Sequence, residues 1–404
     1  MTKRSMPKIA FITAETPFGK SETFILDELL EIQKKNPNII VIPRSPPRAI
    51  FHKSGYELLK STIRIPVFNM RIIFEFLKAI FEKKNREVIK SVLMQTDTIK
   101  KRIKNFLILP KAIFVSKIIG KQNICHIHAH WGSTTATIAY IVSRLTDIPW
   151  SMTLHRWDIA ENNLLKEKVK TCKFVRCISK HGEKELLIIL NNESKNKIHV
   201  LHMGASIPQK QTKISLKNKI FTIVTPAHLY PVKGHKYLIE ACQTLIEKGV
   251  ENFIMIFYGD GHLRETLKND IYSRNLQKHI IIPGAIEHTK LIALYESNKI
   301  DLVILPSITT VDNEHEGIPV SLIEAIAHKI PVISTKTGGI PELLSVKETL
   351  IEEKSSQELA QSIINMMQNN KLRDRTTEIN LQKVEAKFNI DKITNELLNL
   401  ITAK

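Results

Sequence analysis

Short apolar runs rich in β-branched residues recur along the chain, and segments with helical spacing follow them. The run KIAFITAE (8–15) precedes a helical pattern at 21–33, and the run IFTIVTPAHL (220–229) precedes another at 233–249. Apolar runs that alternate with helices are typical of buried parallel strands. Further runs of this kind lie at 124–130, 150–155, 174–179, 197–204, 253–261, 279–286, 301–307 and 330–339.

The runs form two series, which predict an α/β protein with two Rossmann-like domains. The length of 404 residues agrees with this, since single cores stop growing near ~250–300 residues. The polar, unpatterned stretch near 205–219 is the expected seam. We therefore expect a first domain over 1–207 and a second over 208–387. The amphipathic helix near 388–404 is expected to pack back on the first domain.

The piece 57–121 lacks this alternation and reads as basic amphipathic helices. The chain has a net charge of +19, and residues 51–121 hold 16 Lys and Arg against 5 Asp and Glu. Three interpretations stay open: solvated helices that cover a sheet, a cationic face for anionic lipid, and nucleic-acid binding. The last is disfavoured, because no helix-turn-helix, zinc-finger or RRM signature is present and few aromatic residues lie among the charges. We favour the anionic membrane surface.

Composition narrows the class of protein further. With 43% hydrophobic and 25% charged residues, the chain is not disordered, collagen-like or a coiled coil. Four cysteines without CxxC spacing exclude a disulfide framework and favour a reduced, cytoplasmic compartment. The apolar run near the N-terminus ends at Glu15, too early for a signal peptide, and no 18-residue apolar stretch suggests a membrane span.

The segment EHEGIPVSLIEAIAHKIPVISTKTGGIPELL (314–344) carries the most specific pattern. Pro319 suits the first turn of a helix, so the backbone N–H groups of Val320 and Ser321 would be free to bind phosphate. Glu316 and Glu324 are too far apart for the close pair of a retaining hydrolase. Two carboxylates that bracket a phosphate site suit two sets of sugar hydroxyls. An amphipathic helix with solvated acids is the structural alternative.

This segment resembles the donor site of family 4 retaining glycosyltransferases of the GT-B fold. It matches E-G-x-P-x-x-x-x-E-A followed by P-V-[IV]-x-[ST]-x-x-G-G-x-P-E. The resemblance covers nearly the whole chain and implies two facing Rossmann-like domains with the active site in the cleft. It implies that Glu316 contacts the donor sugar and that Glu324 binds the ribose. Backbone amides near Glu316 would hold sugar and phosphate: Gly317, Ile318, Val320 and Ser321.

A second match is PAHLYPVKGHKYLIEA (226–241), which resembles G-R-L-x-x-x-K-G-x-x-x-L-I-x-A of the same family. It implies that Lys233, next to Gly234, binds the donor diphosphate and stabilises its developing charge. The chain departs from the family at His228, which stands where the family has an arginine. A neutral imidazole supplies one donor and no fixed charge. Weaker matches at 258–267 and 283–307 imply donor contacts by Gly259 and Gly261 and backbone contacts to the base near Ala285.

The first half resembles the family's acceptor side. HIHAHWGSTTATIAYIVSRLTDIPWSMTLHRWDI (126–159) is similar to H-x-H-F-G…P…T-x-H-x-x-D-I, and GKSETFILDEL (19–29) to S-E-T-F-I-x-x-E of exopolysaccharide enzymes, including the colanic acid type. The match implies that His155 lies beside the reacting sugar and its phosphate. The other acceptor-side candidates are Gly19, Ser21, His128, His130 and Asp158. The alternating histidines at 126, 128 and 130 invite a zinc reading, but no further ligand is spaced with them, and we expect no metal.

Together these residues predict a retaining hexosyltransferase with His155, Lys233 and Glu316 as its catalytic residues. It would move a sugar from a UDP- or GDP-sugar to a growing, lipid-linked cell-surface polysaccharide (exopolysaccharide, capsule or lipopolysaccharide), without a cofactor. It would act in the cytoplasm, on the inner face of the plasma membrane. Two alternatives remain: a non-catalytic glycosyltransferase-like binding protein, for which His228 speaks, and a nucleotide-sugar epimerase on the same fold.

Overall fold

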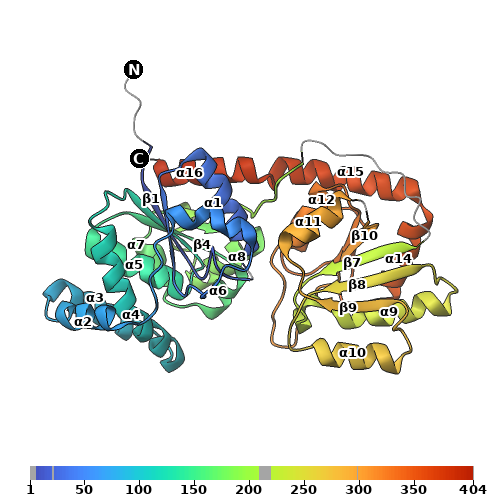
Figure 1. The fold of residues 1–404 in the computed structure, drawn as a ribbon, viewed down its shortest axis with the longest axis horizontal. Helices are drawn as coiled ribbons and strands as arrows, with labels where there is room; N and C mark the ends of the chain where they lie inside the picture. The colour runs from blue at the N-terminus through green and yellow to red at the C-terminus, as the bar shows by residue number, and fades with distance from the viewer. Residues whose placement is uncertain (1–5, 21, 209–219, 298, 404) are drawn as a thin grey trace, which may run out of the picture. The chain divides into compact units, whose positions relative to one another are not determined.

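Two parallel six-stranded sheets organise the chain in a computed structural model, which describes residues 6–20, 22–208, 220–297 and 299–403 (Figure 1). The chain divides into a first unit, Met1–His202 with Asp391–Lys404, and a second unit, Met203–Ile390. This division falls at 202/203, whereas the sequence suggested a seam near 205–219. Most of that stretch, 209–219, lies outside the described residues.

The first sheet has the order β2-β1-β3-β4-β5-β6, and all its strands are parallel. Its strands are β1 (Ile9–Thr13), β2 (Ile39–Pro43), β3 (His126–His130), β4 (Trp150–Leu154), β5 (Val175–Cys177) and β6 (Ile198–Val200). The sequence pattern predicted all of them except β2. This strand was missed although all five of its residues are buried.

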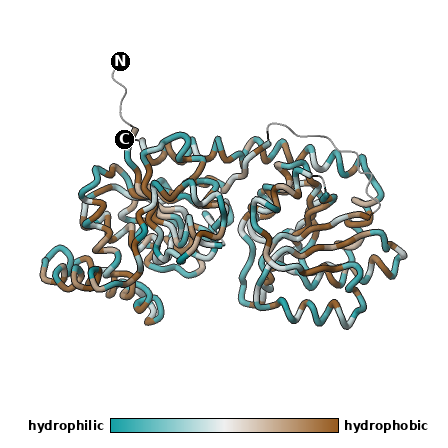
Figure 2. The backbone as a smooth tube through the Cα atoms, in the orientation of Figure 1, coloured by the Kyte–Doolittle hydropathy of each residue, from teal (hydrophilic) through white to brown (hydrophobic). Residues whose placement is uncertain are grey.

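Alternate residues of β1 separate two cores of the first unit. Ala10 and Ile12 face a core shared with the helices that follow β2, and Ile9 and Phe11 face the core of the opposite side. Figure 2 shows hydrophobic stretches in strands of both units, and most strand residues are buried, as expected for a sheet with both faces covered. The helices are α1 (Thr23–Lys35), the 3-10 helix η1 (Lys53–Ser61), α2 (Met70–Ala79), α3 (Lys83–Met94), α4 (Ile99–Ile119), α5 (Thr134–Thr146), α6 (Arg156–Glu161), α7 (Leu165–Thr171), α8 (Lys180–Ile189), η2 (Lys195–Lys197) and α16 (Ile390–Thr402).

The C-terminal helix α16 packs in the second of these cores. Its residues Ile393, Leu397 and Ile401 are buried with residues of β1, β2 and α1. Lys35 of α1 forms a 2.8 Å ion pair with Asp391. The segment after α15 thus belongs to the first unit although it is the last part of the chain.

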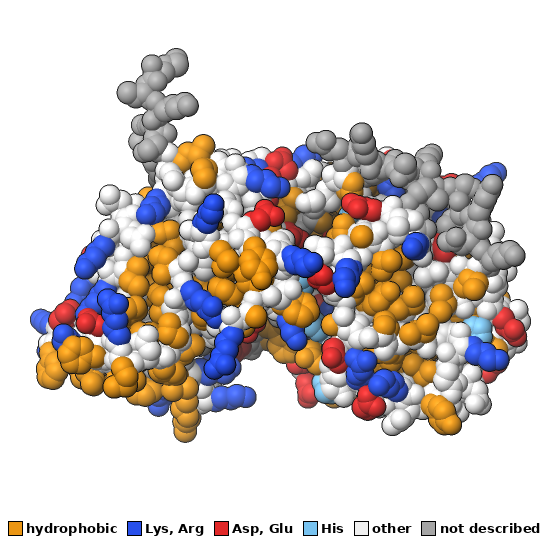
Figure 3. All heavy atoms as spheres, in the orientation of Figure 1, with side chains coloured by type: hydrophobic (Ala, Val, Ile, Leu, Met, Phe, Trp, Pro, Cys, Tyr) orange, Lys and Arg blue, Asp and Glu red, His pale blue; other side chains and the backbone are white. Residues whose placement is uncertain are grey.

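The basic piece consists of η1, α2, α3 and α4. Helix α4 runs through Pro110 without a break, and Lys111 directly after it is fully buried. Its ammonium donates to the backbone oxygens of Pro43, Arg44 and Ile65 at 2.6–2.7 Å. Burial lowers the pKa of Lys111 to about 7. Figure 3 shows hydrophobic, Lys and Arg side chains together along the edge of the first unit formed by these helices.

The second sheet has the parallel order β12-β11-β10-β7-β8-β9. Its strands are β7 (Phe221–Pro226), β8 (Phe253–Tyr258), β9 (Ile280–Gly284), β10 (Leu302–Leu305), β11 (Val332–Thr335) and β12 (Leu350–Ile351), the last not predicted. Its helices are η3 (Pro231–Lys233), α9 (His235–Glu247), α10 (Arg264–Ser273), α11 (His288–Glu296), α12 (Val320–Ala327), α13 (Ile340–Leu343), α14 (Ser356–Gln368) and α15 (Asn370–Lys387). This is the doubly wound order of dinucleotide-binding folds, which bind ligands where the order reverses, here beyond β7 and β10.

Candidate active site

Lys233 and Glu316 meet beyond the carboxyl ends of β7 and β10. The ammonium of Lys233, in η3, forms an ion pair with Oε2 of Glu316, in the loop that follows β10. The hydroxyl of Ser307 donates to the same oxygen at 3.4 Å. Both charged side chains are largely buried, at 18% and 16% exposure. The two strongest sequence predictions, which rest on segments 83 residues apart, therefore form one cluster.

Helix α12 begins directly after this cluster, with Pro319 as its N-cap. Pro319 has an extended ψ of 119°, so it lies one residue before the first turn in which the sequence analysis had put it. Val320 and Ser321 are the first two helical residues, whose N–H groups have no acceptor within an α-helix. Such N–H groups favour a negatively charged ligand.

Glycines allow the loops around the ion pair to approach each other closely. A Cβ on Gly234, at φ +70°, would lie 1.9 Å from the backbone oxygen of Pro306. A Cβ on Gly259 would lie 1.8 Å from Ala227 O, and one on Gly261 2.5 Å from Leu229 O. Gly338, which the sequence analysis did not single out, would meet Glu316 O at 1.7 Å, at φ +53°. Gly338 belongs to the Gly-Gly pair of the family pattern, and this pair could have identified Gly338 from the sequence.

Glu324, predicted to bind ribose, is almost buried and already has a partner. Its Oε1 lies 2.8 Å from Nε2 of His288, at the start of α11. His288 was not among the predicted site residues, and nothing in the local pattern around it pointed to Glu324. Ala285 is exposed directly after β9. The N–H of Gly259 donates to Gly284 O at 3.0 Å, which ties the loop after β8 to the end of β9.

His228 is exposed and lies in a row of three rings. Its imidazole stacks on Tyr230 at 5.6 Å between centroids, and Tyr230 stacks on His262 at 5.1 Å. The two stacking partners come from the loops after β7 and after β8. The position at which the family has an arginine is thus filled by an aromatic stack. Neither Tyr230 nor His262 was among the predicted site residues.

On the first unit, Glu22 organises the segment that resembles S-E-T-F-I-x-x-E. Its carboxylate accepts hydrogen bonds from the backbone N–H groups of Glu15 and Thr16 at 2.7 and 2.6 Å, and from the indole N–H of Trp131. Trp131 has a φ of 77°, which is rare for a residue other than glycine. A Cβ on Gly19 would lie 2.5 Å from Glu15 Oε2. Ser21 lies outside the described residues.

His155 is the N-cap of α6 and packs against two aromatic rings. Its ring lies 4.3 Å from that of Trp131 and 5.3 Å from that of Phe24. Its Nε2 is buried without a hydrogen-bond partner among the described residues. Burial lowers the pKa of His155 to about 3, so the ring is neutral near pH 7. A neutral imidazole can exchange hydrogen bonds with a substrate but carries no charge to it.

Asp158 holds the turn that presents His155. Its two oxygens accept from the N–H groups of His155 at 2.9 Å and of Ser133 at 3.1 Å. Burial raises the pKa of Asp158 to about 6. The side chain is 3% exposed, so Asp158 shapes the backbone around His155 and offers little surface to a ligand.

The acceptor-side candidates His128 and His130 have no exposed surface, which corrects their assignment to the acceptor side. Both are fully buried, because β3 lies between β1 and β4 and both of its faces are covered. The two ring nitrogens of His128 lie 2.7 Å from Ser151 Oγ and 2.9 Å from Thr153 Oγ1. Alternation placed the histidines on one face of the strand but could not show that other residues cover that face.

A buried charged group lies beside these histidines. Glu28 Oε1 is 2.8 Å from Nη1 of Arg176 and 3.3 Å from Nε2 of His130. Arg176 holds the pKa of the Glu28 carboxyl far below its usual range in spite of burial. Glu28 is the last residue of the S-E-T-F-I-x-x-E match. Its position therefore has a structural reason in this chain: it anchors α1 to β3 and β5.

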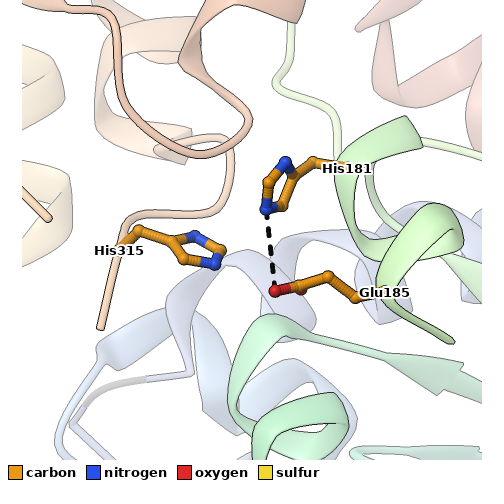
Figure 4. Close-up of side chains that lie close together, drawn as sticks. All are labelled: His181, Glu185 and His315. Carbon is orange, nitrogen blue, oxygen red and sulfur yellow. Dashed lines mark ion pairs between the residues drawn. The ribbon is translucent and has the colours of Figure 1, made fainter. Parts of the chain in front are cut away.

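Two further histidines have polar partners within their own units. His181 and Glu185 lie one turn apart on α8, with Nε2 and Oε1 at 3.6 Å (Figure 4). His315, in the loop before α12, donates through Nδ1 to Glu316 O at 3.1 Å. His315 thereby helps to fix the backbone of the residue that pairs with Lys233.

Comparisons with known proteins show what the chain is similar to. Residues 206–383 match the family described as glycosyl transferases group 1. WcaL of Escherichia coli K12, whose name assigns it to colanic acid biosynthesis as a glycosyltransferase, is 32% identical over 214 residues, which are 52% of each chain. The amylovoran biosynthesis glycosyltransferase AmsK of Erwinia amylovora is 33% identical over 178 residues, 43% of this chain and 42% of that one. The alignments thus span about half the length of these relatives.

Solved structures resemble the chain over nearly its full length. HepE of Anabaena in complex with UDP superposes with a TM-score of 0.72 at 17% identity, over 98% of this chain and 100% of that one. HepE has also been solved with UDP-glucose, with a TM-score of 0.70 at 16% identity over the same shares. Among the described residues, no helix is both long and apolar enough to cross a bilayer. The predicted resemblance is confirmed at this level: the chain has the two Rossmann-like domains of a GT-B fold, and residues 206–383 match the group 1 glycosyl transferase family model.

Proposed function

We propose that the chain is a retaining glycosyltransferase that moves a sugar from a nucleotide-sugar to a growing cell-surface polysaccharide. The observation that carries this proposal is the Lys233–Glu316 ion pair at the reversal point of the second sheet. It lies within the group 1 domain and directly before the N-terminus of α12. A cation, a carboxylate and a row of N–H groups together suit a diphosphate joined to a sugar.

The proposed donor contacts follow from these residues. The ammonium of Lys233 and the N–H groups of Val320 and Ser321 hold the diphosphate, and Glu316 accepts hydrogen bonds from sugar hydroxyls. Glu324, held by His288, binds the ribose, and backbone near Ala285 contacts the base. We propose a UDP-sugar as the donor, because HepE, with the same fold, has been solved with UDP and with UDP-glucose. GDP-sugars are the other donors to test.

In the proposed reaction the bond between the anomeric carbon and the phosphate oxygen breaks first. The electron pair stays on the nucleoside diphosphate, where Lys233 and the N-terminus of α12 stabilise the charge. The acceptor hydroxyl then attacks the same face of the oxocarbenium-like sugar, and its proton passes to the departing phosphate. His155 is the proposed neutral hydrogen-bond partner of the sugar and phosphate. Lys233 and the N-terminus of α12 supply the positive charge that stabilises the leaving diphosphate. The proposed reaction therefore includes no cofactor.

The acceptor is proposed to be a lipid-linked saccharide of exopolysaccharide, capsule or lipopolysaccharide synthesis. The names of WcaL and AmsK, which refer to colanic acid and amylovoran biosynthesis, support an exopolysaccharide. A lipid-linked acceptor fits a peripheral enzyme on the cytoplasmic face of the plasma membrane. The basic helices of 57–121 support this location, since they favour an anionic surface.

Thermal unfolding with a panel of nucleoside diphosphates and nucleotide-sugars tests the donor site. A ligand at ~100 times its Kd stabilises the fold by about 2.7 kcal/mol, which shifts Tm clearly. We expect UDP and one UDP-sugar to raise Tm, and Lys233→Ala to remove the shift. Release of UDP from that sugar by the wild-type protein then tests turnover. If no nucleotide changes Tm, the proposed donor site is wrong.

His228 favours a second candidate function, a binding protein of the same fold without turnover. The family's fixed cation is replaced here by a ring stacked on Tyr230. If this alternative holds, UDP-sugars raise Tm but release no UDP, and His228→Arg does not restore release. An epimerase would instead convert the donor sugar without releasing UDP, and product analysis with donor alone distinguishes it.

A further inference from the structure

We propose that the edge formed by α2, α3 and the first half of α4 inserts apolar side chains into an anionic lipid bilayer. More than half of the exposed large hydrophobic side chains of the described chain lie between Phe51 and Leu107. Soluble surfaces carry such residues singly, and a concentration of them marks an interaction site. This inference builds on the membrane location proposed above and adds the mode of attachment and the residues that make it.

Helix α2 has two apolar faces, and only one of them is used by the fold. Ile72 and Ala79 are fully buried in the core of the first unit. The opposite stripe follows helical spacing but has no cover in the described structure. Its members and their exposures are Met70 (80%), Ile73 (38%), Phe74 (57%) and Leu77 (50%), and Phe81 (78%) continues it after the helix end.

Helix α4 repeats this arrangement in its first half. Ile108 and Leu109 are buried, whereas Ile99, Ile103 and Phe106 are 73%, 55% and 53% exposed. The exposed residues are spaced by four and three positions and therefore share a face. With Leu93 and Arg102 they line a groove of about 250 Å³ between α3 and α4. An acyl chain is a suitable occupant for a groove with almost no polar lining.

Basic side chains accompany both stripes, and this charge identifies the partner. Residues 51–121 hold 16 Lys and Arg against 5 Asp and Glu. On α2 the ammonium of Lys78 lies 4.1 Å above the ring of Phe74, so apolar and cationic groups alternate on one surface. Figure 3 shows this mixture along the edge made by these helices. Apolar residues rimmed by Lys and Arg fit an anionic bilayer, because the cations meet headgroups while the apolar groups enter the acyl layer.

Vesicle sedimentation with the full-length protein tests the proposal. Vesicles of phosphatidylcholine alone are compared with vesicles that contain roughly equal parts of phosphatidylglycerol. We expect binding to the anionic vesicles, reduced but not abolished at about 1 M salt, where the Debye length is about 3 Å. The residual binding reports the apolar contribution. Complete loss at high salt, or equal binding to both vesicle types, would overturn insertion into an anionic bilayer.

Two double variants separate the contributions. Phe74→Ser/Phe81→Ser should weaken anionic-vesicle binding at least about tenfold and remove the salt-resistant part. Lys83→Glu/Lys90→Glu should weaken mainly the salt-sensitive part. The control is Ile188→Ser, which removes an equally exposed apolar side chain (75%) from α8 of the same unit and should bind as wild type. All these side chains are exposed, so the variants should fold as wild type does. An unchanged Tm in each variant checks this.

Insertion itself is read from Phe74→Trp. Its emission should shift to the blue with anionic vesicles and be quenched by brominated acyl chains, whereas a surface-bound indole would not be quenched.

A second copy of this chain is the other conceivable occupant of this apolar surface. If sedimentation in solution shows a dimer that Phe74→Ser/Phe81→Ser dissociates, and vesicles do not bind, the proposal is wrong. The UDP-dependent Tm shift should be unchanged in every variant, so failure here is separate from failure of the donor site.

Discussion

The ammonium of Lys233 and the carboxylate of Glu316 neutralise each other at the reversal point of the second sheet. Their side chains are 18% and 16% exposed, so the pair is shielded from most of the solvent. A donor diphosphate would attract the ammonium, and sugar hydroxyls would engage the carboxylate. In the absence of a ligand, the ion pair compensates both charges. A bound nucleotide-sugar would replace it with contacts from Lys233 to the diphosphate and from Glu316 to the sugar.

We predict that Lys233→Ala and Glu316→Ala each remove more than ~2 kcal/mol of transition-state stabilisation, or about thirtyfold in kcat/KM. Because the two groups form one cluster, the double variant should lose much less than the sum of the two effects. UDP release from the preferred UDP-sugar measures all three. Lys236→Ala is a matched control, because Lys236 is exposed on α9 and forms a 3.8 Å ion pair with Glu240. Turnover within about threefold of wild type in both single variants would refute the assignment.

We predict that Gly338→Ala destabilises the second unit and impairs nucleotide binding. A Cβ there would lie 1.7 Å from Glu316 O and 2.9 Å from Nδ1 of His315, at a φ of +53°. Strain and displacement of the Glu316 loop should together cost at least about 3 kcal/mol. Gly249→Ala is the control: φ is +75°, but the new Cβ meets nothing within 4 Å. It should cost about 1 kcal/mol and leave the UDP-dependent Tm shift unchanged. Equal costs in urea unfolding would contradict the close-packing argument.

Most strands could be predicted from the sequence because their periodicity lies within short windows of the chain. Lys233 and Glu316 were singled out by resemblance to two family patterns, each of which is also short, and the structure brings the two side chains together. The partners that were missed come from far along the chain: His288 lies 36 residues before Glu324, and Trp131 lies 109 residues after Glu22. Side-chain pairing at that separation depends on how strands are ordered in the sheet, which local periodicity does not contain.

The sequence pattern also could not show which faces of the strands and helices are buried. His128 and His130 alternate as surface-lining residues would, but the central position of β3 covers both faces. Conversely, α2 and α4 read as amphipathic helices, yet their exposed faces carry Phe74 and Ile99 as well as lysines. A helix with apolar residues on two faces has a pattern close to that of a fully buried helix. The three-dimensional structure is needed to show which face lacks a partner.

Acid should destabilise the fold through buried neutral histidines. His235 is 2% exposed, packs against Phe257, and has no hydrogen-bond partner for either nitrogen among the described residues. Burial, aided by the charge of Lys233, lowers its pKa to about 3. Between about pH 6.5 and pH 3 the unfolded chain therefore binds a proton that the folded chain does not. Stability is present above pH 6.5 and is lost as the pH falls, by up to about 1.4 kcal/mol per pH unit for each such histidine.

His235→Leu tests this dependence, because it removes the titrating group and fills a site that offers the imidazole no polar partner. Urea unfolding at about pH 7 and about pH 5 gives the free energy of unfolding for both proteins. Between about pH 7 and about pH 5, the free energy of unfolding should fall less in the variant than in wild type. This difference does not depend on how stable the variant is at about pH 7. An identical pH dependence in wild type and His235→Leu would show that His235 does not titrate as proposed.

Glu22 should control the conformation of Trp131 and, through it, the ring of His155. Its buried carboxylate accepts from two backbone N–H groups, the Thr16 hydroxyl at 2.8 Å and the indole N–H. Glu22→Gln keeps the volume but replaces one acceptor by an NH2 group that faces donors. We expect a loss of about 1–3 kcal/mol in the free energy of unfolding, a change in tryptophan emission and slower UDP release, with UDP binding intact. Glu31→Gln, in the helix α1 that Glu22 caps, is the control: Glu31 pairs with Lys34 and Lys35, and its substitution should leave tryptophan emission and UDP release unchanged. Unaltered emission and turnover in Glu22→Gln would mean that Trp131 holds its φ of 77° without the carboxylate.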